Sequence, residues 1–257
     1  MSDPLEPQSH PRGPAGGGWP EAVPSDPEAP KMSEVERLWK VVVSPVETFR
    51  AIAARPTWVL LLILSLLVTV GIWLLLVQKI DFAESMRQQF EQQGQEMPAG
   101  AEKMAGASKI IYPVFAALGS IAFPLIIAAV FLAFNLVGGR LRFPVSYSVL
   151  MHSGVPSLLK AILSLPVLLA RESMTLQDAQ AGILKSNLAA FAPEDTAPRL
   201  MVLLSSLDVF SIWSLVLMIV GYSVAARVSK GTAAAFVVGG WAALVLIGVF
   251  FAGFKPS

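Results

Sequence analysis

The sequence predicts an all-α, polytopic integral membrane protein: a five-helix transmembrane bundle behind a disordered N-terminal tail. Five apolar runs carry this prediction, because each is about 20 residues or longer and a helix rises about 1.5 Å per residue, enough to cross a hydrocarbon core of ~30 Å. Of the 257 residues, 54% are hydrophobic and 14% are charged, whereas soluble domains carry about 25% charged residues. Backbone amides inside lipid must pair within their own segment, so the runs should be helices. The runs are Trp58–Val77, Ile110–Val137, Tyr147–Ala170, Leu200–Ala226 and Thr232–Phe254.

Composition also limits the function classes. A net charge of +1 gives no reason to expect a nucleic acid as partner. The chain has no cysteine, which excludes disulfides and thiolate metal sites. The patterns GxxxxGK[ST], HExxH and GxSxG do not occur, so we expect no cofactor, no metal and no enzymatic activity. The lipid bilayer is the partner that composition predicts directly.

The chain divides into three segments by composition. Residues 1–30 hold many prolines and a run of three glycines, and predict a disordered, acidic tail. Residues 31–56 have the mixed apolar and charged pattern of an amphipathic segment at the membrane surface. Residues 57–257 contain the five spans and form the membrane domain.

The amphipathic segment contains a clear helix start. Ser44 can cap, Pro45 suits the first helical position, and Glu47 can close a capping box. Phe49 and Ile52 then share the apolar face of a short helix that leads into the first span. Residues 31–55 are also the part of the chain expected to meet a cytoplasmic protein partner.

Orientation follows from the basic residues in the short loops. Arg140 and Arg142 follow the second span, Arg227 and Lys230 follow the fourth, and neither loop holds an acid. The positive-inside rule therefore places these loops and the N-terminus in the cytoplasm and the C-terminus outside. The opposite loops are longer and of mixed charge. We expect them to be partly helical, the first as a continuation of span one and the second over residues 175–192.

Lys160 is the most unusual residue, because it lies near the middle of the third span. A charge at that depth costs at least ~2.5 kcal/mol and needs a partner or water. Asp208 lies at a similar distance from the outer end of the fourth span, so the two predict an intramembrane ion pair. Three interpretations stay open: a functional polar site, a pair that fixes helix register, or a Lys160 that reaches the interface alone.

His152 and a row of small residues are two further candidates. His152 precedes Lys160 by two helical turns and could share its face, although a lone histidine is more often a satisfied polar residue than a metal ligand. Small residues recur every fourth position in the fifth span, and such a ridge lets another helix approach closely. Its use is helix packing within the bundle or a homo-oligomer face. The ridge consists of Gly231, Ala235, Gly239 and Ala243.

Three stretches resemble the Yip-type, or Ypt/Rab-interacting, membrane protein family. They are Val41–Phe49, the turn Gly138–Phe143 with the following Ser146–Val149 and Pro156, and Leu207–Trp213 with Gly221 downstream. The resemblance covers roughly residues 33–254 and looks closest to a bacterial member, which implies a multi-pass protein of the inner membrane. It implies five spans, a cytoplasmic N-terminus and no enzymatic activity. Eukaryotic members bind Rab GTPases, a partner that a bacterial chain would not meet.

Together these features predict a non-enzymatic membrane-organising, adaptor or trafficking-like protein. The alternative is a small transporter or lipid-handling protein that uses Lys160 and Asp208.

Overall fold

The computed structural model describes residues 29–252, apart from 93, 176–177, 180–181 and 194–195. The prediction for the N-terminal tail therefore falls almost entirely outside the described residues. The elements are α1 (Glu34–Val43), α2 (Pro45–Ala54), α3 (Val59–Lys79), α4 (Phe82–Gln92), α5 (Ala101–Val130), the 3₁₀ helix η1 (Phe131–Val137), α6 (Phe143–Ser153), α7 (Val155–Ala170), the 3₁₀ helix η2 (Leu188–Phe191), α9 (Pro198–Ser206), α10 (Val209–Ala226) and α11 (Lys230–Phe251).

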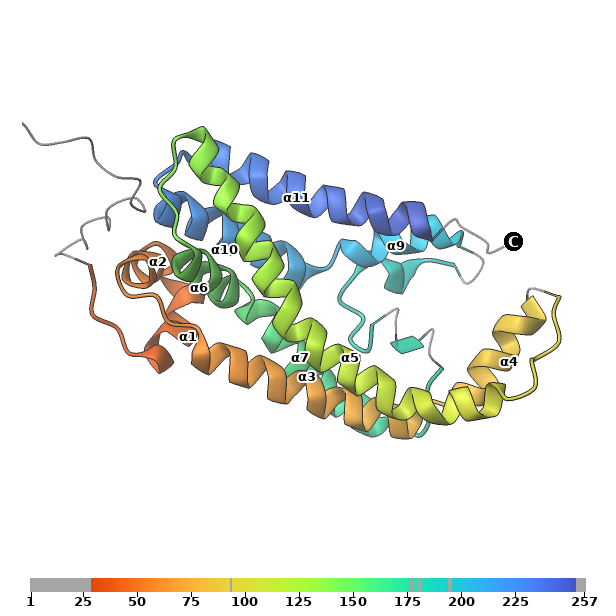
Figure 1. The fold of residues 1–257 in the computed structure, drawn as a ribbon. Helices are drawn as coiled ribbons and strands as arrows, with labels where there is room; N and C mark the ends of the chain where they lie inside the picture. Colours follow the sequence, from red (N-terminus) through yellow and green to blue (C-terminus); the bar gives the residue numbers. More distant parts are fainter. Residues whose placement is uncertain (1–28, 93, 176–177, 180–181, 194–195, 253–257) are drawn as a thin grey trace, which may run out of the picture.

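The predicted fold class is confirmed. Within the part of the chain that the structure describes, five helical segments are long and apolar enough to cross a membrane, and most of their side chains face outward, as lipid contact requires. Figure 1 shows α3 and α11 along opposite edges of the molecule, with α5 running obliquely between them. Helices α1 and α2 lie at one end, and α4 and α9 lie at the other. The spanning segments are Val59–Lys79, Lys103–Val137, Phe143–Ala170, Val209–Ala226 and Lys230–Phe251.

The prediction that residues 200–226 form one uninterrupted span is wrong. The run is divided into α9 and α10, with Leu207 and Asp208 between them. Asp208 is the N-cap of α10, where its carboxylate accepts the backbone N–H groups of Phe210 and Ser211 at 3.0 and 3.2 Å. A capping aspartate satisfies amides that an unbroken helix would have paired internally, so it stabilises the break.

The third span is also in two parts. Helices α6 and α7 meet at Gly154, and Pro156 lies in the first turn of α7, where a missing N–H costs no hydrogen bond. Pro113 and Pro124 instead lie inside α5, which continues through both. Proline is tolerated inside membrane helices when neighbouring groups satisfy the freed carbonyls.

The turn between η1 and α6 requires its two glycines. Gly138 has a φ of 85°, a conformation that L side chains rarely adopt. A Cβ on Gly139 would lie 2.7 Å from the carbonyl oxygen of Phe134, so only glycine fits. Asn135 closes the turn through two hydrogen bonds to the backbone of Leu141, at 2.7 and 2.9 Å.

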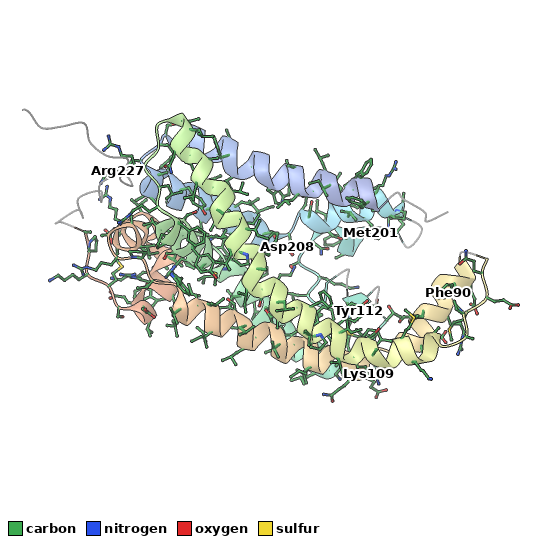
Figure 2. The ribbon with its side chains drawn as sticks, viewed as in Figure 1. Phe90, Lys109, Tyr112, Met201, Asp208 and Arg227 are labelled. Carbon is green, nitrogen blue, oxygen red and sulfur yellow. The ribbon has the colours of Figure 1, made fainter. Side chains whose placement is uncertain are left out.

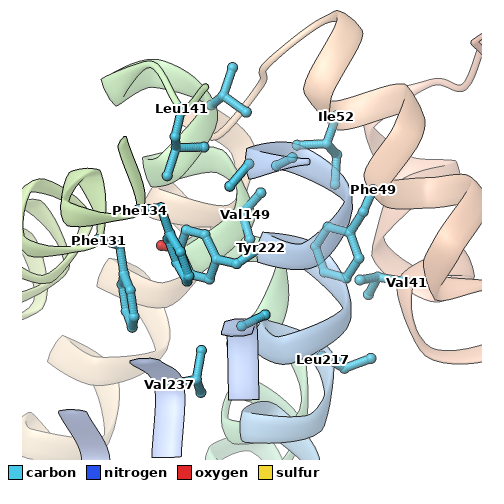
Figure 3. Packing of buried hydrophobic residues seen from close by; sticks show 14 residues of the cluster. Val41, Phe49, Ile52, Phe131, Phe134, Leu141, Val149, Leu217, Tyr222 and Val237 are labelled. Atoms are coloured by element: carbon cyan, nitrogen blue, oxygen red, sulfur yellow. The ribbon is translucent and has the colours of Figure 1, made fainter. Parts of the chain in front are cut away.

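The largest core cluster lies near the end that carries α1 and α2. Figure 3 shows Tyr222 of α10 at its centre, against Phe134 and Phe131 from η1. The Tyr222 ring lies 4.4 Å from that of Phe131, centroid to centroid, and its hydroxyl donates to the carbonyl of Ser146 at 3.2 Å. Since Ser146 also donates to Ala128 at 2.7 Å, this cluster joins α5, α6 and α10.

The helix expected near residue 44 is present as α2, but its contacts differ from the expectation. Phe49 and Ile52 are fully buried in the core cluster, so the apolar face of α2 packs on the bundle instead of lying in the headgroups. The predicted capping box at Ser44 is wrong, because Ser44 is the C-cap of α1 and makes no side-chain cap bond. The same Ser-x-x-Glu pattern closes a box eleven residues earlier, at Ser33 and Glu36.

The opposite end is less helical than predicted. Helix α3 ends at Lys79, and α4 starts as a separate helix, because Ile80 pairs with Met174 in a short parallel bridge. Thr175 and Asp178 do cap one another, with the Thr175 hydroxyl donating to Asp178 at 2.9 Å. Among the described residues of the helix predicted over 175–192, Asp178 and Ala179 are helical, residues 182–187 have irregular backbone, and η2 follows.

Candidate functional site

Lys160 and Asp208 lie together, where α7 passes the start of α10. The Lys160 Nζ donates to Asp208 Oδ2 at 2.8 Å, and Asp208 lies near the middle of the molecule in Figure 2. Ser186, which the sequence did not single out, donates its hydroxyl to the same carboxylate oxygen. We call Lys160, Ser186 and Asp208 the polar cluster.

The carboxylate of Asp208 is fully used. Oδ1 accepts two backbone N–H groups of α10, and Oδ2 accepts the Lys160 ammonium and the Ser186 hydroxyl. The Asp208 side chain is 2% exposed, whereas that of Lys160 is 26% exposed. A buried charge with this many donors is stable without water, because each lone pair has a partner.

The polar cluster also fastens a connecting segment to α10. The backbone N–H of Val209 donates to Ser186 at 3.2 Å, and that of Leu188 donates to Leu207 at 3.3 Å. These bonds form the antiparallel bridge of Asn187 with Asp208. Residues 186–188 are therefore held at the break between α9 and α10, and the ion pair links that break to α7.

His152 does not belong to the polar cluster. Its ring is buried, and Nδ1 lies 2.8 Å from the Ser148 carbonyl one turn earlier in α6. It lines a narrow crevice with Thr57 and Trp58, at the end that carries α1 and α2. Within the described residues, no group of three or more His, Cys, Asp or Glu side chains could hold a metal ion. His152 is thus placed as a satisfied polar residue.

The end that carries α1 and α2 is held by a buried arginine. Arg37 of α1 is 3% exposed, and its Nη1 donates to the Arg55 carbonyl at 2.8 Å and to Thr57 Oγ1 at 2.7 Å. Burial lowers the pKa of this guanidinium, although the nearby carboxylate of Glu34 opposes the shift. These bonds tie α1 to the connection between α2 and α3, so the two short helices form a fixed cap on the bundle. We call α1 and α2 together the cap.

The outer face of the cap is apolar. Val35, Trp39 and Val43 recur every fourth residue along α1 and are 66%, 57% and 63% exposed. This spacing places them on one helix face, opposite the buried Arg37 and Val41. We call these three residues the α1 stripe. An ion pair between Glu36 and Lys40 lies beside it, and the Lys40 ammonium is 5.7 Å from the Trp39 ring centroid.

The small-residue ridge of α11 faces outward. All four of its members are exposed, and a Cβ on Gly239 would meet no atom within 4 Å. The bundle-facing side of α11 consists instead of Ala233 and Val237, which are buried. Among the described residues the ridge therefore does not pack against the bundle, and its use as a homo-oligomer face stays a prediction. The ridge contributes to the surface that contacts lipid.

Sequence reasoning missed three residues that organise these sites. Arg37 is one of several charges in the amphipathic segment, and Ser186 is one of several polar residues in the helix predicted over 175–192, so neither stands out in the sequence. Tyr222 sits in an apolar span with no pattern around it. The capping role of Asp208 did have a signal in the sequence, since Asp directly before an apolar run is a preferred N-cap.

The fold and these sites define a class: a multi-pass α-helical membrane protein with a helical cap at one end and a satisfied ion pair between two spans. The profile of the Yip1 domain matches residues 39–252, which is most of the chain. The chain therefore belongs to the Yip1 family, as the resemblance predicted, and this family is not known as enzymatic. Neither a curated protein nor a solved structure matches the chain.

Proposed function

We propose that this protein is a non-enzymatic, membrane-organising adaptor that binds a protein partner through its cap. The observation that carries the proposal is the α1 stripe, whose three apolar side chains stay exposed. Other apolar side chains of the cap, Val41, Phe49 and Ile52, are buried in the core cluster. An exposed apolar helix face bordered by charges is typical of a helix that lies in a partner's groove.

The contacts of α2 favour a protein partner over a simple membrane anchor. An interfacial anchor would place the apolar face of α2 in lipid, but Phe49 and Ile52 are buried against α6 and α10. Arg37 then holds α1 in a fixed position through its bonds to Arg55 and Thr57. A rigid surface loses little conformational freedom on binding, which increases the affinity available from a small patch.

Site-specific photocrosslinking tests the proposal. A photoreactive residue at Trp39 should give one discrete protein adduct in native membranes. The matched control is Leu67 of α3, which is similarly exposed at 64% but lies within a membrane span, and it should give lipid adducts only. Lipid adducts alone at position 39 would contradict the adaptor proposal.

The alternative is a transporter or lipid-handling protein that uses Lys160 and Asp208. The exposed quarter of the Lys160 side chain favours it, since an ammonium with access to a ligand could exchange Asp208 for a headgroup. Replacing Lys160 with Met and Asp208 with Asn together removes both charges, keeps the capping oxygen of residue 208, and distinguishes the two functions. An adaptor retains its activity, whereas a transporter loses it.

The proposal includes an orientation and a location. We place the cap in the cytoplasm and the C-terminus outside, in a bacterial inner membrane, on the basic short loops that flank α6 and α11. A reporter fused after Ser257 should then be active only on the outer side. A cytoplasmic signal from that fusion would contradict the orientation.

A further inference from the structure

Two neighbouring cavities lie at the end of the molecule opposite the cap. The first, of about 420 Å³, is bounded by the end of α3, the start of α4, the start of α5 and residues 172–173. The second, of about 310 Å³, lies between α4 and α5. Phe82 lines both, so one side chain separates them. Both volumes fall in the range of about 300–1,000 Å³ that ligand sites occupy.

The first cavity carries charges of both signs. Lys79, Asp81, Lys109 and Glu172 line it, which gives two ammonium and two carboxylate groups. Lys79 donates to the Arg171 carbonyl, and Asp81 caps α4 by accepting the Glu84 N–H at 3.0 Å. The side chains of Lys109 and Glu172 make no hydrogen bond or ion pair with any other described residue. They are the two groups available for a ligand.

The second cavity is mostly apolar, with Ser85 and Ser108 as its polar lining residues. Met86 of α4 and Met104 and Ile111 of α5 line it, together with the rings of Phe82 and Tyr112. The Tyr112 ring stacks on Phe82 at 5.3 Å and on Trp73 of α3 at 5.4 Å, centroid to centroid. This stack fixes the wall between the two cavities.

The polar cavity lies at the level of the lipid headgroups. Lys79 is the last residue of the first span, and Glu172 follows the end of α7 by two residues. Lys109 lies six residues inside the 35-residue segment Lys103–Val137, which is longer than the roughly 20 residues that a span needs, so we place it near the outer end of that span. Figure 2 shows Lys109 and Tyr112 on α5 near the end of the molecule that carries α4. A phosphate at this depth would meet lysine donors, and hydrogen bonds between an ammonium and a phosphate are among the strong, charge-assisted ones.

We infer that this double cavity binds one phospholipid whose headgroup carries a phosphate and a primary ammonium. The phosphate binds Lys109 with Lys79 beside it, and the ammonium binds Glu172 with Asp81 beside it. Part of an acyl chain enters the apolar cavity past Phe82. The balance of two positive and two negative side chains matches a zwitterionic headgroup, whereas an anionic headgroup would leave both carboxylates unmatched.

Native mass spectrometry of the full-length protein in a neutral detergent tests this inference. The probe is dioctanoyl phosphatidylethanolamine, and its expected bound fraction exceeds that of dioctanoylglycerol, which lacks the headgroup, and of O-phosphoethanolamine, which lacks the chains. Lys109→Glu should weaken binding of the probe about tenfold or more, because a charge-assisted bond becomes a repulsion. Glu172→Gln should weaken the probe but not dioctanoyl phosphatidic acid, which has no ammonium.

A matched pair of glycine variants tests the cavity itself. Gly106 lines the polar cavity and Gly119 lies further along the same helix, and a Cβ at either position meets no atom within 4 Å. Gly106→Leu should fill the cavity and abolish binding, and Gly119→Leu should leave it unchanged. Equal binding of the probe to Gly106→Leu and Gly119→Leu would overturn the inference. So would binding of dioctanoylglycerol or O-phosphoethanolamine as strong as that of the probe, or an unchanged affinity of Glu172→Gln for the probe.

Discussion

The ion pair of Lys160 with Asp208 should couple the two residues energetically. Asp208→Asn keeps the capping oxygen Oδ1 but replaces the oxygen that accepts Lys160 and Ser186 with an amide that only donates. Losing one charged and one neutral hydrogen bond costs roughly 2–4 kcal/mol of unfolding free energy. Lys160→Met instead leaves the buried carboxylate with three of its four donors. The free energy of unfolding should fall by about 2–3 kcal/mol. This is less than the ~3–5 kcal/mol lost when one partner of a fully buried ion pair is removed, because the Lys160 side chain is partly exposed.

The double variant Lys160→Met/Asp208→Asn contains neither charge. It should be more stable than the sum of the single costs predicts, by about 1–2 kcal/mol. Reversible unfolding in mixed micelles, followed through tryptophan fluorescence, measures all four proteins of the cycle. If the double variant loses the sum of the two single losses to within about 0.5 kcal/mol, the two residues are not coupled and the polar cluster does not act as a unit.

Three further substitutions test the packing around the sites. Gly221→Ala should lower the free energy of unfolding by about 1–3 kcal/mol, because the new Cβ would lie 2.7–2.9 Å from atoms of Val149 and Phe49. The control is Gly240→Ala, whose Cβ would meet no atom within 4 Å, and it should be neutral or slightly stabilising in the same unfolding assay. Ser186→Ala should cost about 0.5–1.5 kcal/mol and speed hydrogen exchange of residues 186–188, and unchanged exchange would argue against a fastening role. Ser33→Ala should remove the capping box and cost about 1 kcal/mol, seen as faster exchange in the first turn of α1 only.

The membrane-spanning class could be predicted because lipid imposes a simple constraint on length and composition. The pairing of Lys160 with Asp208 followed from counting residues from the outer ends of two spans, which needs only the helical rise. The count succeeded although Asp208 caps a helix instead of lying inside one. Asp directly before an apolar run is a signal for that cap, but apolar residues on both sides of Asp208 made residues 200–226 resemble a single span.

Other features had no local signal. The pattern Ser-x-x-Glu occurs at Ser33 and at Ser44, but only Ser33 forms a capping box. Ser44 is the C-cap residue of α1 and makes no side-chain cap bond to α2. Which face of α2 and α11 meets the bundle depends on packing between distant segments. The buried Phe49 and the outward Gly239 are outcomes of tertiary contacts that a single sequence does not contain.

The most direct test of the adaptor proposal compares two variants in one crosslinking experiment. One carries Lys160→Met and Asp208→Asn, which remove both charges and keep the capping oxygen of residue 208. The other carries Val35→Gln and Val43→Gln, which keep a helix but make the α1 stripe polar. With the photoreactive residue at Trp39 in both, the measured quantity is the yield of the protein adduct relative to the unmodified sequence. The proposal predicts an unchanged yield in the first variant and a loss in the second. A loss in the first with an unchanged yield in the second would contradict it and favour a function centred on the ion pair.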